Sequence, residues 1–129
     1  MTTSALALIA ASPDSLRYSL QALLARLPQI DSVQCVEDVL SLLAALAAAH
    51  LALVVLDVNW LGGEAAPVLV QIKTIAPRAR TVALIDRIEQ QQALQAAAAD
   101  LVLLKGYPAA ELFNIIERLL AQDDPGAKP

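Results

Sequence analysis

Short apolar segments alternate repeatedly along this chain with longer segments of helical periodicity, and this alternation limits the possible folds. In the longer segments apolar residues recur every three or four positions, as on one face of an amphipathic helix. The expected strands cover residues 5–10, 32–36, 51–58, 81–85 and 101–105. The expected helices cover residues 15–27, 38–49, 66–76, 88–99 and 108–122. Strands that alternate with helices in this way favour a parallel sheet covered by helices on both faces.

Most of the expected strands are almost continuously apolar, which is typical of parallel strands buried on both faces. The segment SVQCV (32–36) is the most polar, so we place it at the edge of the sheet. Because crossovers between parallel strands are right-handed, the pattern predicts an α/β fold with a flavodoxin-like, doubly wound, five-stranded parallel sheet. The expected strand order is 2-1-3-4-5, with five helices. One domain would span residues 1–122, and the polar residues 123–129 would form a disordered tail or the start of a linker.

Composition limits the classes of function that the chain can have. The net charge of −4 gives no electrostatic reason for direct binding to nucleic acid. Cys35 is the single cysteine, which excludes an internal disulfide and fits a reducing cytosol. The longest apolar stretch, 42–56, contains His50 and is shorter than the ~20 residues of a membrane-spanning helix. We therefore expect a cytoplasmic protein that does not associate with membranes.

Two helix starts carry residues that suit N-terminal capping. Asp38 precedes the apolar periodicity of the second helix and is the expected N-cap there. Before the first helix, Ser12 is followed by Pro13, and this pair suits an N-cap and a first helical position. Asp14 would then lie in the first turn, where the helix dipole favours a carboxylate.

In a doubly wound sheet, ligands bind outside the carboxyl ends of the strands, near the switch point between strands 1 and 3. Asp57 lies at the end of the third expected strand, and Lys105 at the end of the fifth. A carboxylate with a nearby ammonium can act as a nucleophile in phosphoryl transfer, or can form a simple ion pair at the edge of the sheet. The other residues at this edge are Ala11, Ser12, Asn59, Ile85 and Asp86.

The segments LIAASPDSLRYSLQALLARLPQIDSV (8–33), LVVLDVNWLGG (53–63), APRARTVALI (76–85) and LLKGYPAAEL (103–112) together resemble one family. The chain is similar to the receiver domains of two-component response regulators, most closely to those fused to helix-turn-helix output domains. The resemblance implies that Asp57 is the equivalent of the phosphoacceptor and Lys105 of the residue that contacts the phosphoryl group. It also implies that the backbone carbonyl of Asn59 is the equivalent of a Mg²⁺ ligand.

The chain departs from the family pattern at several positions of the site. Ala11 and Ser12 replace the acidic pair that holds Mg²⁺, which leaves Asp57 as the obvious carboxylate ligand. The switch hydroxyl is replaced by Ile85 and the aromatic switch residue by Val102. These substitutions predict a degenerate receiver, which is not an enzyme, binds no cofactor and acts independently of phosphorylation.

The residue after Ile85 is also unusual for the family. This position is usually small in receivers, whereas here it is Asp86, whose charge would oppose an incoming phosphate unless it turns inward to help a metal.

Two alternatives remain open. In the first, Asp57 is a genuine phosphoacceptor with unusual or absent metal support, and Asp57 and Asn59 are then weak candidates for Mg²⁺ ligands. In the second, the chain is a flavin-binding flavodoxin-like protein, although only Ser12 and Ser15 suggest a phosphate loop. The resemblance further implies protein partners, including a possible homodimer through the fourth helix (88–99), the fifth strand (101–105) and the fifth helix (108–122).

Overall fold

The computed structural model describes residues 5–47, 50–61 and 64–121, and the expected tail at 123–129 lies outside the described residues. Five parallel strands form one sheet in the order β2-β1-β3-β4-β5, which confirms the predicted topology and the edge position of the polar strand. The strands are β1 (Leu6–Ala10), β2 (Ser32–Val36), β3 (Leu51–Asp57), β4 (Arg80–Ile85) and β5 (Leu101–Leu104).

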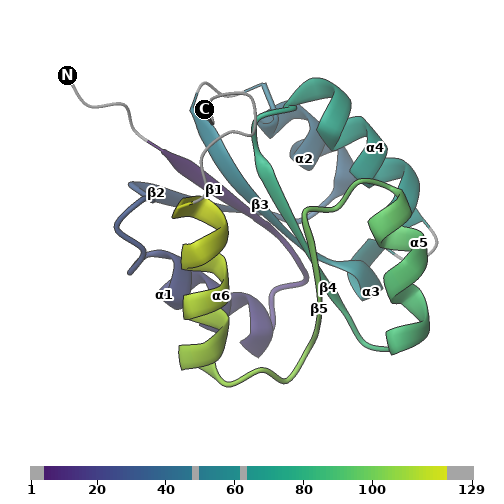
Figure 1. The fold of residues 1–129 in the computed structure, drawn as a ribbon. Coiled ribbons are helices and arrows are strands. Elements are labelled where there is room, and N and C mark those ends of the chain that lie inside the picture. The colour runs from purple at the N-terminus through teal and green to yellow at the C-terminus, as the bar shows by residue number, and fades with distance from the viewer. Residues whose placement is uncertain (1–4, 48–49, 62–63, 122–129) are drawn as a thin grey trace, which may run out of the picture.

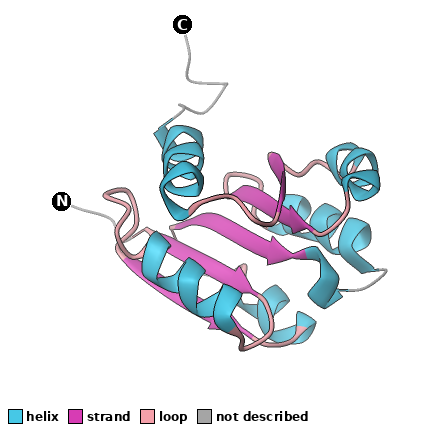
Figure 2. Ribbon diagram, turned by 90° about the horizontal axis from the view of Figure 1, so that it is seen from below, coloured by secondary structure: helices cyan, strands magenta, loops and turns pink. Residues whose placement is uncertain are grey.

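Helices cover both faces of this sheet, as the alternating pattern predicts (Figure 1). The helices are α1 (Ser15–Leu24), α2 (Val39–Ala45), α3 (Val58–Leu61), α4 (Ala65–Ile75), α5 (Gln91–Ala96) and α6 (Ala109–Ala121). Helices α1 and α6 pack on one face, and α2, α4 and α5 pack on the other (Figures 1 and 2).

The core has two halves because successive residues of a strand point to opposite faces of the sheet. Leu8 and Ala10 of β1 belong to the half beneath α2, α4 and α5. Ala7 and Ile9 of the same strand belong to the half beneath α1 and α6. All four are fully buried, which explains why a continuously apolar segment is required at a central position of the sheet.

Two segments differ from the expected helices. The sequence after β3 suggests a loop at 59–63, whereas Val58–Leu61 forms the short helix α3, so the described residues contain one α-helix more than predicted. Val58 and Leu61 are buried, and this packing stabilises a turn that periodicity over so few residues cannot reveal. The helix expected at 88–99 is divided into a 3₁₀ helix, η2 (Ile88–Gln90), and the shorter α5.

One of the two expected caps is correct. The carboxylate of Asp38 accepts a hydrogen bond from the backbone N–H of Ser41 at 2.7 Å, as an N-cap should. The expectation for Ser12 is wrong, because Asp14 is the N-cap of α1 and accepts hydrogen bonds from the N–H groups of Leu16 and Arg17. Asp14 has extended backbone angles, so α1 begins one residue after it rather than at Pro13.

Among the described residues, every helix is too short or too polar to span a lipid bilayer.

Candidate functional site

The two residues that the sequence singles out lie at the carboxyl edge of the sheet. Asp57 is the last residue of β3, and its side chain is only 8% exposed. Lys105 follows β5 directly, and its backbone N–H donates to the carbonyl oxygen of Ile85 at 2.9 Å. This backbone hydrogen bond joins the ends of β4 and β5, and it fixes where the lysine side chain starts.

The ammonium of Lys105 bridges two carboxylates. Its Nζ lies 2.6 Å from Oδ1 of Asp57 and 3.1 Å from Oδ1 of Asp86. Asp57 Oδ1 also accepts a hydrogen bond from the backbone N–H of Asn59 at 3.1 Å. We call Asp57, Asp86 and Lys105 the ion triad. With all three groups ionised, the triad carries a net charge of −1.

The two carboxylates keep Lys105 protonated. Burial alone would lower the pKa of the ammonium, because it disfavours the charged form. Hydrogen bonds to Asp57 and Asp86, together with their negative charges, outweigh burial and raise the pKa of Lys105 above its ordinary value. The lysine is therefore a fixed cation at neutral pH.

The remaining predicted positions add no charge to the triad. Ala11 is fully buried and lies one residue beyond the register pair Ala10–Leu56, which places it beside the end of β3. Ser12, which follows it, is exposed. Ile85 and Val102 are buried in the core half beneath α2, α4 and α5.

The donor set does not fit Mg²⁺ as it stands. Mg²⁺ is bound through one or two carboxylates together with waters and phosphate oxygens in near-octahedral geometry. Here the two carboxylates of the ion triad, Asp57 and Asp86, are both engaged by the Lys105 ammonium. Within the described part of the chain, no group of three or more His, Cys, Asp or Glu side chains could hold a metal ion.

The pairing of Asp86 with Lys105 is the feature of this site that sequence reasoning missed. Asp86 is recognisable as an edge residue, but the expected effect was repulsion of phosphate or support of a metal. The register of the sheet explains the contact: Ile85 of β4 pairs with Leu104 of β5, so the residues that follow them, Asp86 and Lys105, are level with each other. Neighbouring strands that end in opposite charges favour an ion pair at this position.

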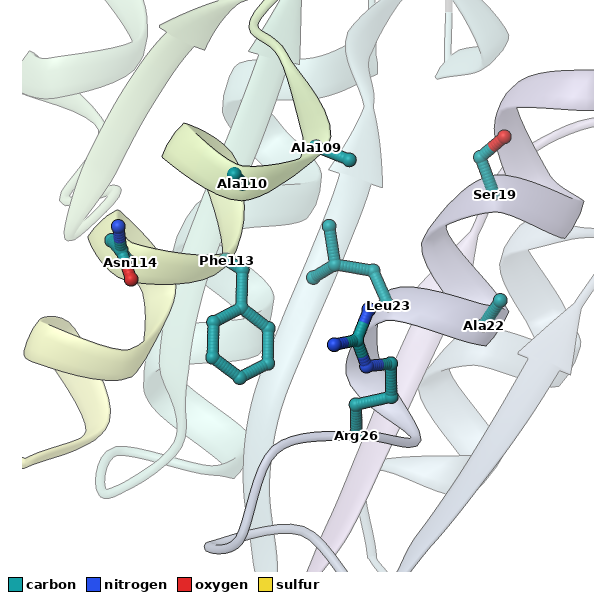
Figure 3. A pocket seen from close by; sticks show the side chains of 8 residues that line it. All are labelled: Ser19, Ala22, Leu23, Arg26, Ala109, Ala110, Phe113 and Asn114. Carbon is teal, nitrogen blue, oxygen red and sulfur yellow. The ribbon is translucent and has the colours of Figure 1, made fainter.

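A separate groove lies between α1 and α6 and has a volume of about 590 Å³ (Figure 3). Leu23, Arg26, Phe113 and Asn114 are among the side chains that line it. The Arg26 guanidinium lies 5.8 Å from the centre of the Phe113 ring, a distance suited to a cation–π contact. No residue of the ion triad lines this groove, so it is distinct from the site at the carboxyl edge.

Comparisons with known proteins identify solved structures that have a similar fold. No protein-family model matches the chain, and no curated protein matches its sequence. Solved structures do match. The chain is similar to a LuxR family DNA-binding response regulator from Silicibacter pomeroyi, with a TM-score of 0.75 and 24% identity over 90% of this chain and 91% of that chain.

Two further structures are similar at lower identity. The BeF3-activated DrrB receiver domain matches with a TM-score of 0.78 and 16% identity, over 93% of this chain and 100% of that one. A putative pilus assembly-related protein from Burkholderia pseudomallei matches with a TM-score of 0.73 and 15% identity, over 93% of this chain and 94% of that one. At these identities the likeness concerns the fold, and the chain has the receiver-domain fold of response regulators.

Proposed function

We propose that the chain is a receiver-like signalling domain of the two-component type, which acts through protein–protein contacts and independently of phosphorylation. The observation that carries the proposal is the 3.1 Å contact of Asp86 with Lys105, which places a second carboxylate on the ammonium that Asp57 contacts. In this arrangement a carboxylate, Asp57, stands at the position of a nucleophile. The cation beside it, Lys105, is already paired with carboxylates of the chain itself.

Physical chemistry supports the loss of phosphoryl transfer. The transferring group develops negative charge, and a metal ion is its main neutraliser in such reactions. Ala11 and Ser12 supply no anionic ligand beside Asp57, and Asp86 adds a negative charge where a phosphoryl group would arrive. Ile85, buried at the end of β4, has no hydroxyl to donate to a phosphoryl oxygen.

Phosphorylation of the intact chain tests the proposal. We expect incubation with acetyl phosphate and Mg²⁺ to leave the intact mass unchanged. We also expect beryllofluoride with Mg²⁺ to leave the fluorescence of Trp60 unchanged. Trp60 lies three residues after Asp57 in the sequence and packs against the core. Asp57→Asn is the matched control, since it removes the nucleophile and keeps the size. A phosphoryl adduct on the wild type that this variant lacks would overturn the proposal.

A second candidate, a genuine phosphoacceptor at Asp57, is favoured by the 2.6 Å contact between Asp57 and Lys105. A cation at this distance can stabilise charge on a transferred group without a metal. This candidate predicts an adduct whose yield is the same with Mg²⁺ and with EDTA. The first proposal predicts no adduct under either condition.

We also propose that the chain forms a homodimer, with α5, β5 and α6 as the interface. Three large apolar side chains near this region are exposed: Ile88 (54%), Leu104 (39%) and Tyr107 (41%). Removing them from water would favour association. Sedimentation over a range of protein concentrations tests the dimer. Leu104→Glu should shift the protein towards monomer, whereas Val70→Glu, at an exposed apolar position on α4 outside this region, should not. A wild type that stays monomeric at high concentration would contradict the dimer.

A further inference from the structure

We propose that the Asp86 carboxylate pairs with the Lys105 ammonium in place of an external anion. It thereby excludes small oxyanions, such as inorganic phosphate, from the carboxyl edge of the sheet. The inference rests on the proposed function, because it explains how the site is kept closed. Its consequence is a latent oxyanion site that a single substitution opens.

The geometry of Lys105 supports this role. A lysine ammonium has three N–H donors, and two of them face Asp57 Oδ1 and Asp86 Oδ1. The two contacts differ in burial: the Asp57 side chain is 8% exposed, and that of Asp86 is 42% exposed. Asp57 therefore belongs to the interior of the site, whereas Asp86 covers the lysine from the solvent side.

The backbone holds Asp86 in this covering position. The N–H groups of Asp86 and Arg87 both donate to Oε1 of Gln90, at 3.2 and 3.1 Å. Ile85, the residue before Asp86, accepts the backbone hydrogen bond from Lys105. The backbone is thus held on both sides of Asp86, so the contact with the ammonium orders the side chain of Asp86 without having to order its backbone.

Charge gives the sign and the size of the expected effect. An oxyanion that approaches Lys105 meets two carboxylates against one ammonium, a local charge of −1. Asp86→Asn makes the local charge zero, weakens the contact that covers the lysine and keeps the size of the side chain. A like charge about 5 Å away at the protein surface is worth about 10- to 100-fold in binding affinity. We therefore expect this variant to bind inorganic phosphate about 10- to 100-fold more tightly than the wild type.

A phosphate titration followed by the backbone amide NMR shifts of residues 57, 86 and 105 measures this difference. Asp86→Ala, which removes the contact altogether, should show the same gain. Glu89→Gln is the matched control: it removes one negative charge from the same segment, but Glu89 is 75% exposed and pairs with Arg87. It should bind phosphate as weakly as the wild type does. Adding Lys105→Met to Asp86→Asn should abolish the gain.

Two results would overturn the inference. The first is equal phosphate affinity in the wild type, Asp86→Asn and Asp86→Ala. The second is an equal gain in Glu89→Gln, which would show that general charge and not the contact with Lys105 is responsible. Phosphorylation of the wild type by acetyl phosphate is a different outcome that refutes the proposed function. If the wild type is not phosphorylated and the Asp86 variants show no gain in phosphate affinity, only this inference is refuted.

Discussion

The ammonium of Lys105 lies 2.6 Å from Oδ1 of Asp57, a contact between the ends of two strands that are not neighbours in the sheet. Strand β4 lies between them, and the carboxylate that follows β4, Asp86, contacts the same ammonium. One lysine therefore ties together the ends of three consecutive strands.

A double-mutant cycle on Asp57 and Lys105 measures the strength of this contact. Lys105→Met leaves two carboxylates without their counter-charge, and we expect it to lower the free energy of unfolding by about 2 kcal/mol, less than for a fully buried pair. Asp57→Asn should relieve part of that loss, giving a coupling energy of about 1–2 kcal/mol in urea denaturation.

The exposed pair formed by Arg87 and Glu89 is the matched control for this cycle. Both side chains are more than 70% exposed, so their coupling should be below about 0.5 kcal/mol. A coupling between Asp57 and Lys105 that is no larger than this would contradict the tight contact.

Ala11→Asp should create a dependence on Mg²⁺. Ala11 is fully buried beside the end of β3, so a second carboxylate there meets Asp57 and lowers the free energy of unfolding by about 2–4 kcal/mol. Mg²⁺ that binds both carboxylates in the folded state only would restore stability by mass action. Thermal unfolding with and without Mg²⁺ measures this. Ala11→Asn, whose side chain has the size of Asp but no charge, should not respond to Mg²⁺, and neither should the wild type. An equal response in all three proteins would contradict the prediction.

The cap on α2 predicts loss of stability in acid. The hydrogen bonds from Ser41 lower the pKa of Asp38 below its ordinary value of 3.8. A carboxyl group with a depressed folded-state pKa contributes stability above its unfolded pKa, and that stability is lost as the pH falls through the folded pKa. The difference in unfolding free energy between the wild type and Asp38→Asn should therefore shrink below about pH 4. Chemical denaturation at pH 7 and pH 3 measures it, and a difference that is constant with pH would contradict the assignment.

Asp100 predicts a large effect of a single side chain far from the triad. Its Oδ2 accepts hydrogen bonds from the backbone N–H of Thr81 at 2.8 Å and the hydroxyl of Thr81 at 3.2 Å, and pairs with Lys73 at 3.3 Å. Thr81 is 1% exposed, so Asp100→Ala leaves its buried N–H without this acceptor. We expect a loss of about 2–3 kcal/mol in urea denaturation.

Two further variants separate the parts of this contribution. Asp100→Asn keeps an acceptor for Thr81 but loses the charge that pairs with Lys73, so it should cost about half as much as Asp100→Ala. Glu111→Ala, at an exposed position of α6, should stay within about 0.5 kcal/mol of the wild type. If Asp100→Ala behaved like Glu111→Ala, the hydrogen bonds to Thr81 would carry no net stability.

The order of apolar and helical segments is enough to predict the sheet and the edge of it at which Asp57 and Lys105 meet. Continuous apolar runs between helical segments favour parallel strands with both faces covered, and the less apolar run SVQCV favours an edge. With the strand order known, the ends of β3 and β5 face the same rim, so the approach of Asp57 and Lys105 was predictable. Hydrophobic periodicity supports these predictions because the pattern of each segment is averaged over many residues.

The folded structure was needed to show which charges meet and where short elements begin. Asp14 rather than Ser12 caps α1, and Val58–Leu61 forms a helical turn, because caps and single turns depend on a few backbone angles. Likewise, one residue of register at the ends of β4 and β5 determines whether Asp86 meets Lys105 or points to solvent. Composition and periodicity say nothing about a single residue of register, whereas a charged contact depends on distances of a few ångströms.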